Sequence, residues 1–424
     1  MATILKRGNS YRITVSLGYD DNGNQIRKYA TYKPKETAPK KIEREVQAFA
    51  VKFEESVLNG TYYDGENLTF REFVNIWERD YAKDNLTIGV LDGYKRNLEL
   101  KVFPEIGNMK ISKIKRKNIL DVYKHMEENG SSANSIRRTH AMLSGIFRKA
   151  YQWELIQDNP CGRVEPPKKE SSKGVASFNV EQTYTFLKAL ELPYTYTKKA
   201  HKSHSSTGEE ISIKEYTETH SISLQWKVYF NLAIFSGCRR GELIALTWKD
   251  IDFKNHTINI TKSASSTNKG QIIKPPKTKA GYREITVPAE CVSLLRKWKK
   301  EQRELSLKLG TYWQGCTGAE FEKNHVFIQD NGSMMHLSSP THKFKEILEA
   351  YNSQYEGDLP LIRLHDLRHT NATLLIAQNT DMKTVSSRLG HSSVATTMDI
   401  YAHALPENDQ IASNTLESLL LKAK

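Results

Sequence analysis

Leu364-His-Asp-Leu-Arg-His-Thr-Asn-Ala-Thr-Leu-Leu375 is the stretch that decides the fold, and its apolar spacing is typical of a helix. His365 and Arg368 are three residues apart, so they share one face of that helix. We expect this face to be exposed, because an imidazole beside a guanidinium suits a phosphate group better than a protein core. An ordinary solvated helix face is the alternative.

A second stretch follows closely: Val385-Ser-Ser-Arg-Leu-Gly-His-Ser-Ser-Val-Ala-Thr-Thr-Met-Asp-Ile-Tyr-Ala-His403. Gly390 is expected to end one helix there, because glycine readily adopts the left-handed conformation that follows a helix C-terminus. His391 then opens the next segment, and Tyr401 lies ten residues further on. One tyrosine among 20 says little alone, so its meaning depends on its spacing from the other groups.

Further upstream, Ser236-Gly-Cys-Arg-Arg-Gly-Glu-Leu-Ile-Ala-Leu-Thr-Trp248 follows an apolar helical pattern. Gly237 can end that helix, so that Arg239 emerges from a rigid turn and Glu242 begins the next helix. A fixed arginine suits bidentate phosphate binding, although a structural pair between Arg239 and Glu242 is an equal alternative. Arg240 adjoins Arg239, and we favour Arg239 because of its distance from Glu242.

The next segment reads as three strands: Ile258-Asn-Ile-Thr261, Gln271-Ile-Ile273 and Arg283-Glu-Ile-Thr-Val-Pro288. Pro276-Lys-Thr-Lys-Ala-Gly281 is the predicted turn between the last two strands. A lysine on such a turn can deliver a proton to a leaving oxygen, although most turn lysines are only solvated. Lys277 and Lys279 are the two candidates.

The amino-acid composition indicates which class of molecule the protein binds. The 424 residues carry 62 Lys and Arg against 49 Asp and Glu, a formal charge of +13, and the pI is near 9.3. This excess indicates a polyanion, most often nucleic acid, with a merely basic soluble enzyme as the alternative. The sequence shows no run of ~18 apolar residues, so we expect no membrane span. Charge appears after five N-terminal residues, which argues against a secretory signal and favours the cytoplasm.

The sequence gives no sign of a cofactor. Its four cysteines form no CxxC pair, which argues against a disulfide framework and against structural zinc. P-loop, GxGxxG, HExxH and GxSxG motifs do not occur in a usable context. We therefore expect neither a metal nor a nucleotide cofactor.

The N-terminal part reads as a small basic domain. Residues 1–33 are expected to form two or three strands, and their alternation puts one set of side chains on a common face: Tyr11, Ile13, Val15 and Leu17. A helix is predicted over 42–57. Residues 1–41 carry nine Lys and Arg against three Asp and Glu, a balance that can present cations to phosphates or form a solvated basic face.

The remaining chain divides at two linkers, 60–67 and 160–174. Residues 68–160 have helical patterns, with the basic connection Lys110-Ile-Ser-Lys-Ile-Lys-Arg-Lys117 before a helix. A larger domain follows, in which 194–222 is polar and weakly patterned and reads as a surface insertion or mobile loop. Apolar residues near the C-terminus form one helical face: Ile411, Leu416, Leu419, Leu420 and Leu421.

The order and spacing of these motifs resemble the tyrosine recombinase (phage integrase) family, in particular integrases of Gram-positive temperate phages and conjugative transposons. The resemblance implies a multidomain, mainly α fold with small β-sheets. Its expected parts are an arm-type DNA-binding domain of a three-stranded sheet plus helix (1–60), a core-binding helical SAM-like domain (68–165) and a mixed α+β catalytic domain (175–424). Residues 408–424 would form a tail that docks on a neighbouring subunit; packing on its own domain is the alternative.

The resemblance also implies the catalytic roles. Tyr401 would attack a scissile phosphodiester, giving a 3′-phosphotyrosine and a free 5′-hydroxyl. Arg239, Arg368 and His391 would bind the phosphate, His365 would be the general base, and Lys277, which matches the family's Lys-Thr position better than Lys279, the general acid. The candidate DNA contacts are Arg12, Arg27, Lys28, Lys113, Lys115, Arg116, Lys117, Arg137 and Arg138.

The resemblance further implies a set of partners. These are double-stranded core and arm attachment sites and a homotetramer on paired sites, with an excisionase and a host DNA-bending protein as further candidates. A DNA-binding architectural protein and a type IB topoisomerase-like enzyme are the competing readings. The full Arg, Lys, His and Tyr set argues against the first, and the N-terminal sheet and C-terminal tail argue against the second.

Overall fold

The computed structural model describes residues 2–19, 23, 25–34, 36–58, 67–168, 176–198, 200–204, 210–268, 270–276, 278–401, 413–414, 416–418 and 420–421. Lys277 and the side chain of Tyr401 lie outside the described part. The chain divides into two compact units, residues 1–171 and 172–424. Across the described residues, no helix is both long and apolar enough to cross a membrane.

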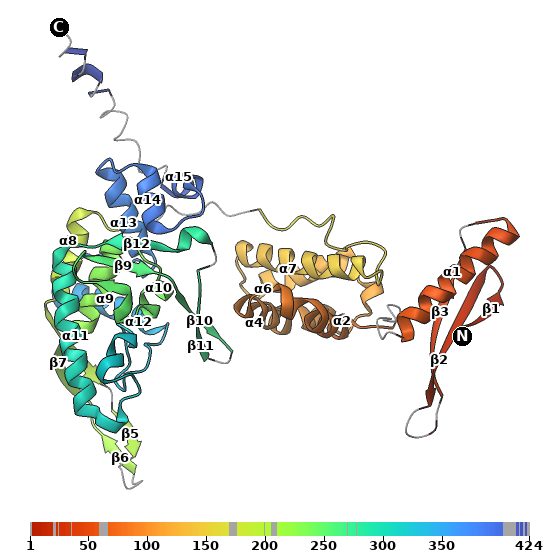
Figure 1. Ribbon diagram of the computed structural model, residues 1–424, viewed down its shortest axis with the longest axis horizontal. Coiled ribbons are helices and arrows are strands. Elements are labelled where there is room, and N and C mark those ends of the chain that lie inside the picture. Colours follow the sequence, from red (N-terminus) through yellow and green to blue (C-terminus); the bar gives the residue numbers. More distant parts are fainter. Residues whose placement is uncertain are drawn as a thin grey trace. The chain divides into compact units, whose positions relative to one another are not determined.

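A three-stranded antiparallel sheet and one helix form the N-terminal part (Figure 1): β1 (Thr3–Arg7), β2 (Ser10–Tyr19), β3 (Gln25–Tyr32) and α1 (Pro39–Leu58). The predicted alternation is confirmed for Ile13 and Val15, which are buried with Phe53 of α1. It is wrong for Leu17, which is 40% exposed. The β2–β3 register shifts beyond Ser16, and such a bulge ends the alternation.

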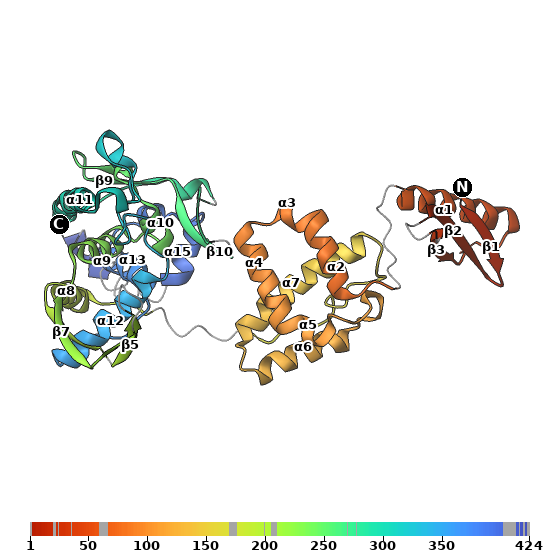
Figure 2. The same cartoon turned by 90° about the horizontal axis from the view of Figure 1, so that it is seen from below.

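Most residues from 70 to 152 are helical, as predicted (Figure 2): α2 (Phe70–Trp77), α3 (Lys83–Asn85), α4 (Ile88–Asn97), α5 (Phe103–Ile106), α6 (Arg116–Glu128) and α7 (Ala133–Gln152). Short π-helical segments join α2 to α3 and α4 to α5. Thr69 caps α2 by accepting from the Glu72 backbone N–H, while Glu72 accepts from the Thr69 backbone. Phe70 stacks on Phe147 of α7 at 4.9 Å, so the core joins the two ends of this segment.

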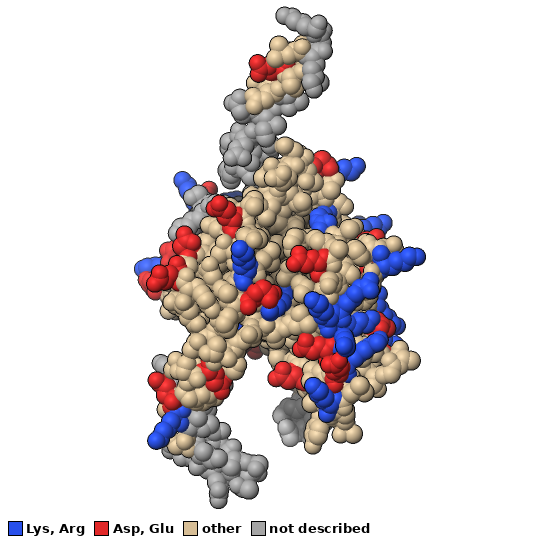
Figure 3. All heavy atoms as spheres, turned by 90° about the vertical axis from the view of Figure 1, so that its left-hand side faces the viewer, with Lys and Arg blue, Asp and Glu red and all other residues tan. Residues whose placement is uncertain are grey.

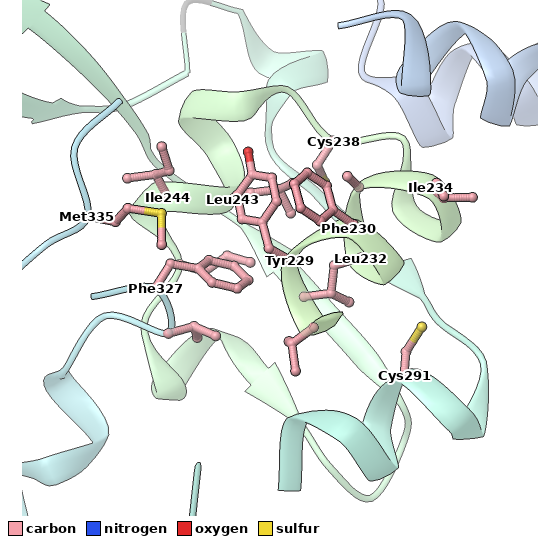
Figure 4. Packing of buried hydrophobic residues seen from close by; sticks show 14 of the residues in the cluster. Tyr229, Phe230, Leu232, Ile234, Cys238, Leu243, Ile244, Cys291, Phe327 and Met335 are labelled. Carbon is pink, nitrogen blue, oxygen red and sulfur yellow. The ribbon is translucent and has the colours of Figure 1, made fainter. Parts of the chain in front are cut away.

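The second unit is built around α9. Its helices are α8 (Val180–Ala189), α9 (Leu224–Ser236), α10 (Arg240–Ala245), α11 (Ala289–Leu309), α12 (Ser339–Gln354), α13 (Asp366–Ala377), α14 (Met382–Leu389) and α15 (Val394–Tyr401). α9 packs against α11 and α13. Its apolar side chains Tyr229, Phe230 and Leu232 lie in the core with Phe327 (Figure 4). A helix buried on several sides gives its C-terminal end a fixed position.

The three predicted strands are present, and between residues 251 and 286 the described part of the chain holds two more that were not predicted. The second unit contains β8 (Ile251–Asp252), β9 (Thr257–Ile260), β10 (Ser263–Thr267), β11 (Gly270–Lys274) and β12 (Arg283–Thr286). β12 pairs with β9, whereas β11 pairs with β10, which the prediction missed. β11 and β12 thus belong to different sheets, and the short turn Lys279–Gly281 leads into β12. Ser-Ala-Ser-Ser-Thr in β10 is too polar to stand out as a strand.

The predicted loop at 194–222 is a hairpin: β4 (Pro193–Lys198) pairs with β7 (Tyr216–Ser221), and β5 (His201–His204) pairs with β6 (Glu210–Ile213). The prediction of an unstructured loop is thus corrected, while the insertion remains a prediction. Gln354 of α12 binds both backbone groups of Thr195, at 2.8 and 2.7 Å. This side chain substitutes for a neighbouring strand and holds β4 in place.

Charges of both signs mix on the face shown in Figure 3, where basic side chains have acidic neighbours. α11 shows the same mixture, since Lys299 and Arg303 both pair with Glu322, at 2.7 and 3.2 Å. Basic side chains that pair with a carboxylate in this way attract a polyanion less than unpaired ones. The net charge alone therefore does not locate the binding surface.

Candidate active site

Arg239 occupies a rigid turn, as predicted. α9 ends at Gly237, whose φ of +63° is left-handed. A Cβ atom there would lie 2.8 Å from both Asn371 Oδ1 and Leu389 Cδ2, so the position requires glycine for space as well as conformation. Arg239 is then the N-cap of α10, and its backbone N–H donates to Glu242 Oε2 at 2.8 Å.

Glu242 is a buried carboxylate shared by two arginines. Arg239 Nη1 donates to Oε1 at 2.9 Å, and Arg283 Nη2 donates to Oε2 at 2.8 Å. Burial alone would raise the pKa of Glu242, but the hydrogen bonds and charges of Arg283 and Arg239 hold the pKa below its ordinary value. The structural pair between Arg239 and Glu242 is therefore present. It leaves Arg239 substantially exposed, with 42% of its side chain accessible.

Arg368 corrects one prediction, because it is only 4% exposed rather than on a solvated face. Its Nη1 donates to the Gly237 carbonyl at 2.8 Å, and its Nη2 donates to the Leu389 carbonyl at 2.6 Å. Burial and the charge of Arg239 lower the pKa of Arg368 to about 10, so the group stays cationic at neutral pH. One guanidinium thus joins the turn of Arg239 to the end of α14.

His391 directly follows Gly390, the second glycine that was predicted to end a helix. Gly390 ends α14 with a φ of +68°, and the His391 backbone N–H donates to the Ser386 carbonyl at 3.1 Å. The His391 ring Nδ1 lies 2.8 Å from Oγ1 of the buried Thr397 on α15. Burial and the charges of Arg368 and Arg239 lower the pKa of His391 to about 4. The ring is therefore neutral at pH 7 and lies in the field of both arginines.

His365 is the N-cap residue of α13, and its ring meets His369 edge-on at 5.2 Å. Desolvation by the surrounding atoms, followed by the charge of Arg368, lowers the pKa of His365. The pKa of His369 falls to about 4, through burial and then the proximity of His365. A neutral His365 can accept a proton, whereas a protonated one could not.

Four of the six predicted catalytic side chains thus converge. Arg239 Nη2 approaches the Gly390 carbonyl at 3.5 Å, next to His391, and its charge also reaches His365. Arg240 is exposed and instead donates to Thr341 Oγ1 at 2.9 Å, which supports the choice of Arg239. Lys279 lies in a short exposed turn, while Lys277 is outside the described residues, so the structure does not choose between the two.

Tyr401 is the last residue of α15. This helix follows His391 directly and contacts α14. The position of the phenol lies outside the described part of the chain. In the tail, Leu416, Leu420 and Leu421 are exposed by 61–70%, whereas Ile411 and Leu419 are not described.

The predicted N-terminal DNA contacts fall on two faces of the sheet. Arg12 pairs with Thr31 and Arg27 pairs with Ser16, so both arginines share the face opposite Ile13. The guanidinium of Arg12 lies over the ring of Tyr29 at 4.2 Å. Lys28 pairs with Val15 and thus belongs to the helix side, although it is exposed.

The predicted contacts of the helical part surround two helix starts. Around the beginning of α6, the exposed cations are Lys113, Lys115, Arg116 and Lys117. Arg137 and Arg138 are exposed on the first turns of α7. Arg137 Nη1 also donates to the Pro167 carbonyl at 2.8 Å, which ties the following linker to α7.

Three further residues of this site were not singled out by the sequence: Arg283, His369 and Thr397. The spacing of His369 four residues after His365 could have suggested a shared helix face. Arg283 offers no comparable local signal, because its contacts with Glu242 and Arg388 are made across the fold. Among the described residues, no three His, Cys, Asp or Glu side chains gather in a way that could hold a metal ion.

Comparison with known proteins identifies the family of the chain. A model of the phage integrase family matches residues 207–408, and a model of the phage integrase N-terminal SAM-like domain matches 69–126. The ICEBs1 integrase of Bacillus subtilis (strain 168) is 30% identical over 311 residues, 73% of this chain and 72% of that protein. The chain belongs to the phage integrase family of tyrosine recombinases.

This recombinase is also 28% identical to a tyrosine recombinase XerC-like protein of Caldanaerobacter subterraneus subsp. tengcongensis, over 98% of each chain. Its fold is similar to the Tn1549 transposon integrase in complex with transposon right end DNA (TM-score 0.63, 21% identity, 82% of this chain and 100% of that one). A lambda integrase tetramer bound to a Holliday junction gives a TM-score of 0.51 at 16% identity, over 93% and 94% of the two chains. The predicted family and fold class are confirmed.

Proposed function

We propose that this recombinase cuts and rejoins double-stranded DNA at specific sites through a covalent 3′-phosphotyrosine, and so integrates and excises a mobile element. The observation that carries the proposal is the double hydrogen bond of Arg368. By binding the Gly237 and Leu389 carbonyls, it brings the turns of Arg239 and His391 together around one small region. Fixed donors of this kind stabilise the charge that develops on a phosphorane-like transition state.

In this proposal Tyr401 is the nucleophile. A tyrosine has an ordinary pKa near 10 and attacks poorly at neutral pH, so it needs a base and a cationic surrounding. The neutral imidazole of His365 would take the phenol proton, while Arg239 and Arg368 bind the non-bridging oxygens. Lys277 would protonate the leaving 5′-oxygen. Each step conserves the phosphate bond energy in the covalent intermediate, so no ATP is consumed.

His391 would donate to the same phosphate from Nε2. Its ring is neutral at pH 7, and a neutral imidazole carries one proton. When Nδ1 accepts from the Thr397 hydroxyl, that proton is on Nε2, which is then free to face the phosphate. The contact with Thr397 would thus select the useful tautomer.

DNA is the partner that this chemistry needs, and the similar Tn1549 and lambda integrases have been solved with DNA. We propose that the exposed cations at the start of α6 and on α7 contact the core site, and that the face of Arg12 and Arg27 contacts an arm site. The exposed leucines of the tail support its docking on a neighbouring subunit in a tetramer. The site of action would be the bacterial cytoplasm, or that of the host for a phage-encoded protein.

The decisive test is a suicide substrate. The probe is the junction sequence of the circularised element, read from direct repeats flanking the gene and nicked beside the cleavage point. We expect a covalent protein–DNA adduct with the native protein and with Tyr312→Phe, a tyrosine that is 80% exposed in the same unit. Tyr401→Phe should give none.

The same substrate separates the alternatives. Binding without any adduct would support an architectural DNA-binding protein. An adduct followed only by relaxation of supercoils, with no exchange of strands between two duplexes, would support a topoisomerase-like enzyme. An adduct that persists in Tyr401→Phe would overturn the assignment of the nucleophile.

A further inference from the structure

Arg283 is a buried arginine that contacts several of the elements around the site. It lies on β12, and only 5% of its side chain is exposed. Its Nε donates to the Arg388 carbonyl at 2.7 Å. Its Nη1 donates to Glu242 Oε1 at 3.3 Å and to the Gly281 carbonyl at 3.2 Å. Its Nη2 donates to Glu242 Oε2 at 2.8 Å and to Cys238 Sγ at 3.6 Å. One guanidinium therefore contacts the Arg239 turn, the end of the lysine turn and the end of α14.

The His391 turn is pressed against this arginine. A Cβ atom on Gly390 would lie 2.9 Å from Arg283 Nη1 and 3.0 Å from the Ala280 carbonyl. Gly390 immediately precedes His391, so a shift of Arg283 would leave that turn without its support. Arg283 and Arg368 thus both support the turn that precedes His391, through the Arg388 and Leu389 carbonyls.

The two arginines that share Glu242 differ in what they can reach. The side chain of Arg239 is 42% exposed, whereas those of Arg283 and Glu242 are each 5% exposed. A buried carboxylate needs a cationic partner, because unpaired charge is strongly disfavoured away from water. If Arg239 were its only partner, Arg239 would be held on Glu242 and its charge would be offset there.

We propose that Arg283 is a positioning residue of the recombinase: it neutralises Glu242 from the buried side, so that the charge of Arg239 remains available to the scissile phosphate. This inference rests on the proposed function, since it assumes that Arg239 binds the phosphate. Arg283 does not touch DNA itself. It acts through Glu242 on Arg239 and through the end of α14 on His391.

The test compares removal of Arg283 with removal of the whole charge pair. Arg283→Met should slow adduct formation on the nicked substrate by about 100-fold, the effect typical of one lost phosphate-stabilising group. Affinity for the same DNA should stay within about fivefold, because distributed phosphate contacts supply most of it. The double variant Arg283→Met/Glu242→Gln should be at least tenfold faster than Arg283→Met, since Arg239 no longer faces an unpaired carboxylate.

Two further variants keep the result interpretable. Arg283→Lys retains the charge but cannot span Glu242 and the Arg388 carbonyl together, so we expect an intermediate rate. Arg296→Met is the matched control, because this exposed arginine of α11 also donates to a backbone carbonyl, that of Phe253 at 2.8 Å. It should cleave like the native protein. If Arg283→Met does not fold, the double variant is compared with the native protein, and its rate should lie within about tenfold of the native rate.

The outcomes separate this inference from the proposed function. Native protein and Arg296→Met without any adduct would refute the proposed function. A native adduct together with native rates in Arg283→Met would refute only the role of Arg283. A double variant that folds but is no faster than the single variant, or that is about 100-fold slower than the native protein where the single variant cannot be made, would show that Arg283 merely holds β12 in place.

Discussion

Arg368 is predicted to serve two purposes, and its removal should affect both stability and chemistry. The residue is 4% exposed and donates to two backbone carbonyls, those of Gly237 and Leu389. Arg368→Ala leaves both acceptors without their partner. An orphaned buried acceptor costs about 1–3 kcal/mol, so two should lower the free energy of unfolding by about 2–6 kcal/mol. For a unit of this size about 1 kcal/mol shifts Tm by about 2–4 °C, so we expect a fall of at least about 4 °C.

The chemical effect should be larger than the binding effect. Loss of one phosphate donor typically lowers the rate by two to three decades, so adduct formation by Arg368→Ala should fall about 100–1,000-fold. Affinity for a core site should remain within about tenfold, because most affinity comes from distributed phosphate contacts. Arg368→Lys keeps the charge and one hydrogen bond, so its Tm should lie between those of the native protein and Arg368→Ala.

The assays are thermal unfolding, gel-shift binding and adduct formation on the nicked substrate, each made with the same preparation. Arg296→Ala is the control, since it removes an exposed arginine with a single carbonyl contact. An Arg368→Ala protein that melts within about 1 °C of the native protein would show that the two carbonyl contacts do not hold the turns together. Native rates of adduct formation would refute the phosphate contact itself.

Three other predictions concern the hydrogen bond of His391, the pH dependence of stability and the N-terminal domain. Thr397→Val should slow cleavage about tenfold, because it removes the hydrogen bond to His391, whereas Thr397→Ser should cleave like the native protein. If Thr397→Val and Thr397→Ser cleave the nicked substrate at equal rates, the tautomer argument is wrong. The pKa values of His369 and His391 are lowered to about 4, so below about pH 6.5 the unfolded chain binds more protons than the folded protein. Tm should therefore fall as the pH is lowered from 6.5 to 4. A Tm that calorimetry finds unchanged across this range would contradict the lowered pKa values. Deletion of residues 1–60 should spare core-site cleavage but abolish integration, and normal integration by the shortened protein would refute a separate arm site.

Local signals in the sequence predicted where two helices end and the chain turns. Gly237 and Gly390 both end helices in the left-handed conformation, as predicted, and Arg239 and His391 follow these helix ends. Such stops depend on the backbone freedom of one residue, so a single sequence can reveal them. The helix that contains Arg368 was also predicted from its periodicity.

The partners of these residues could not be predicted in the same way. Arg368 donates to a carbonyl 131 residues away, and a carbonyl is present in every residue whatever its side chain. Pairing of β12 with β9, rather than with the nearer β11, depends on the packing of the whole sheet. This explains why Arg368 was expected on an exposed face, and why Arg283 was not singled out at all.

The charges of the site indicate what it is arranged to bind. Burial and neighbouring arginines lower the pKa of Arg368 to about 10 and that of His391 to about 4, so at neutral pH the free protein places cationic guanidinium groups beside neutral imidazoles. A phosphate diester brings one negative charge into this region, and the transition state of its cleavage concentrates more charge on the same oxygens. The attraction therefore grows along the reaction, while the frame held by Arg368 and Arg283 does not have to move. Because an interaction that strengthens toward the transition state raises the rate rather than only the affinity, the same arginines would contribute more to cleavage than to DNA binding.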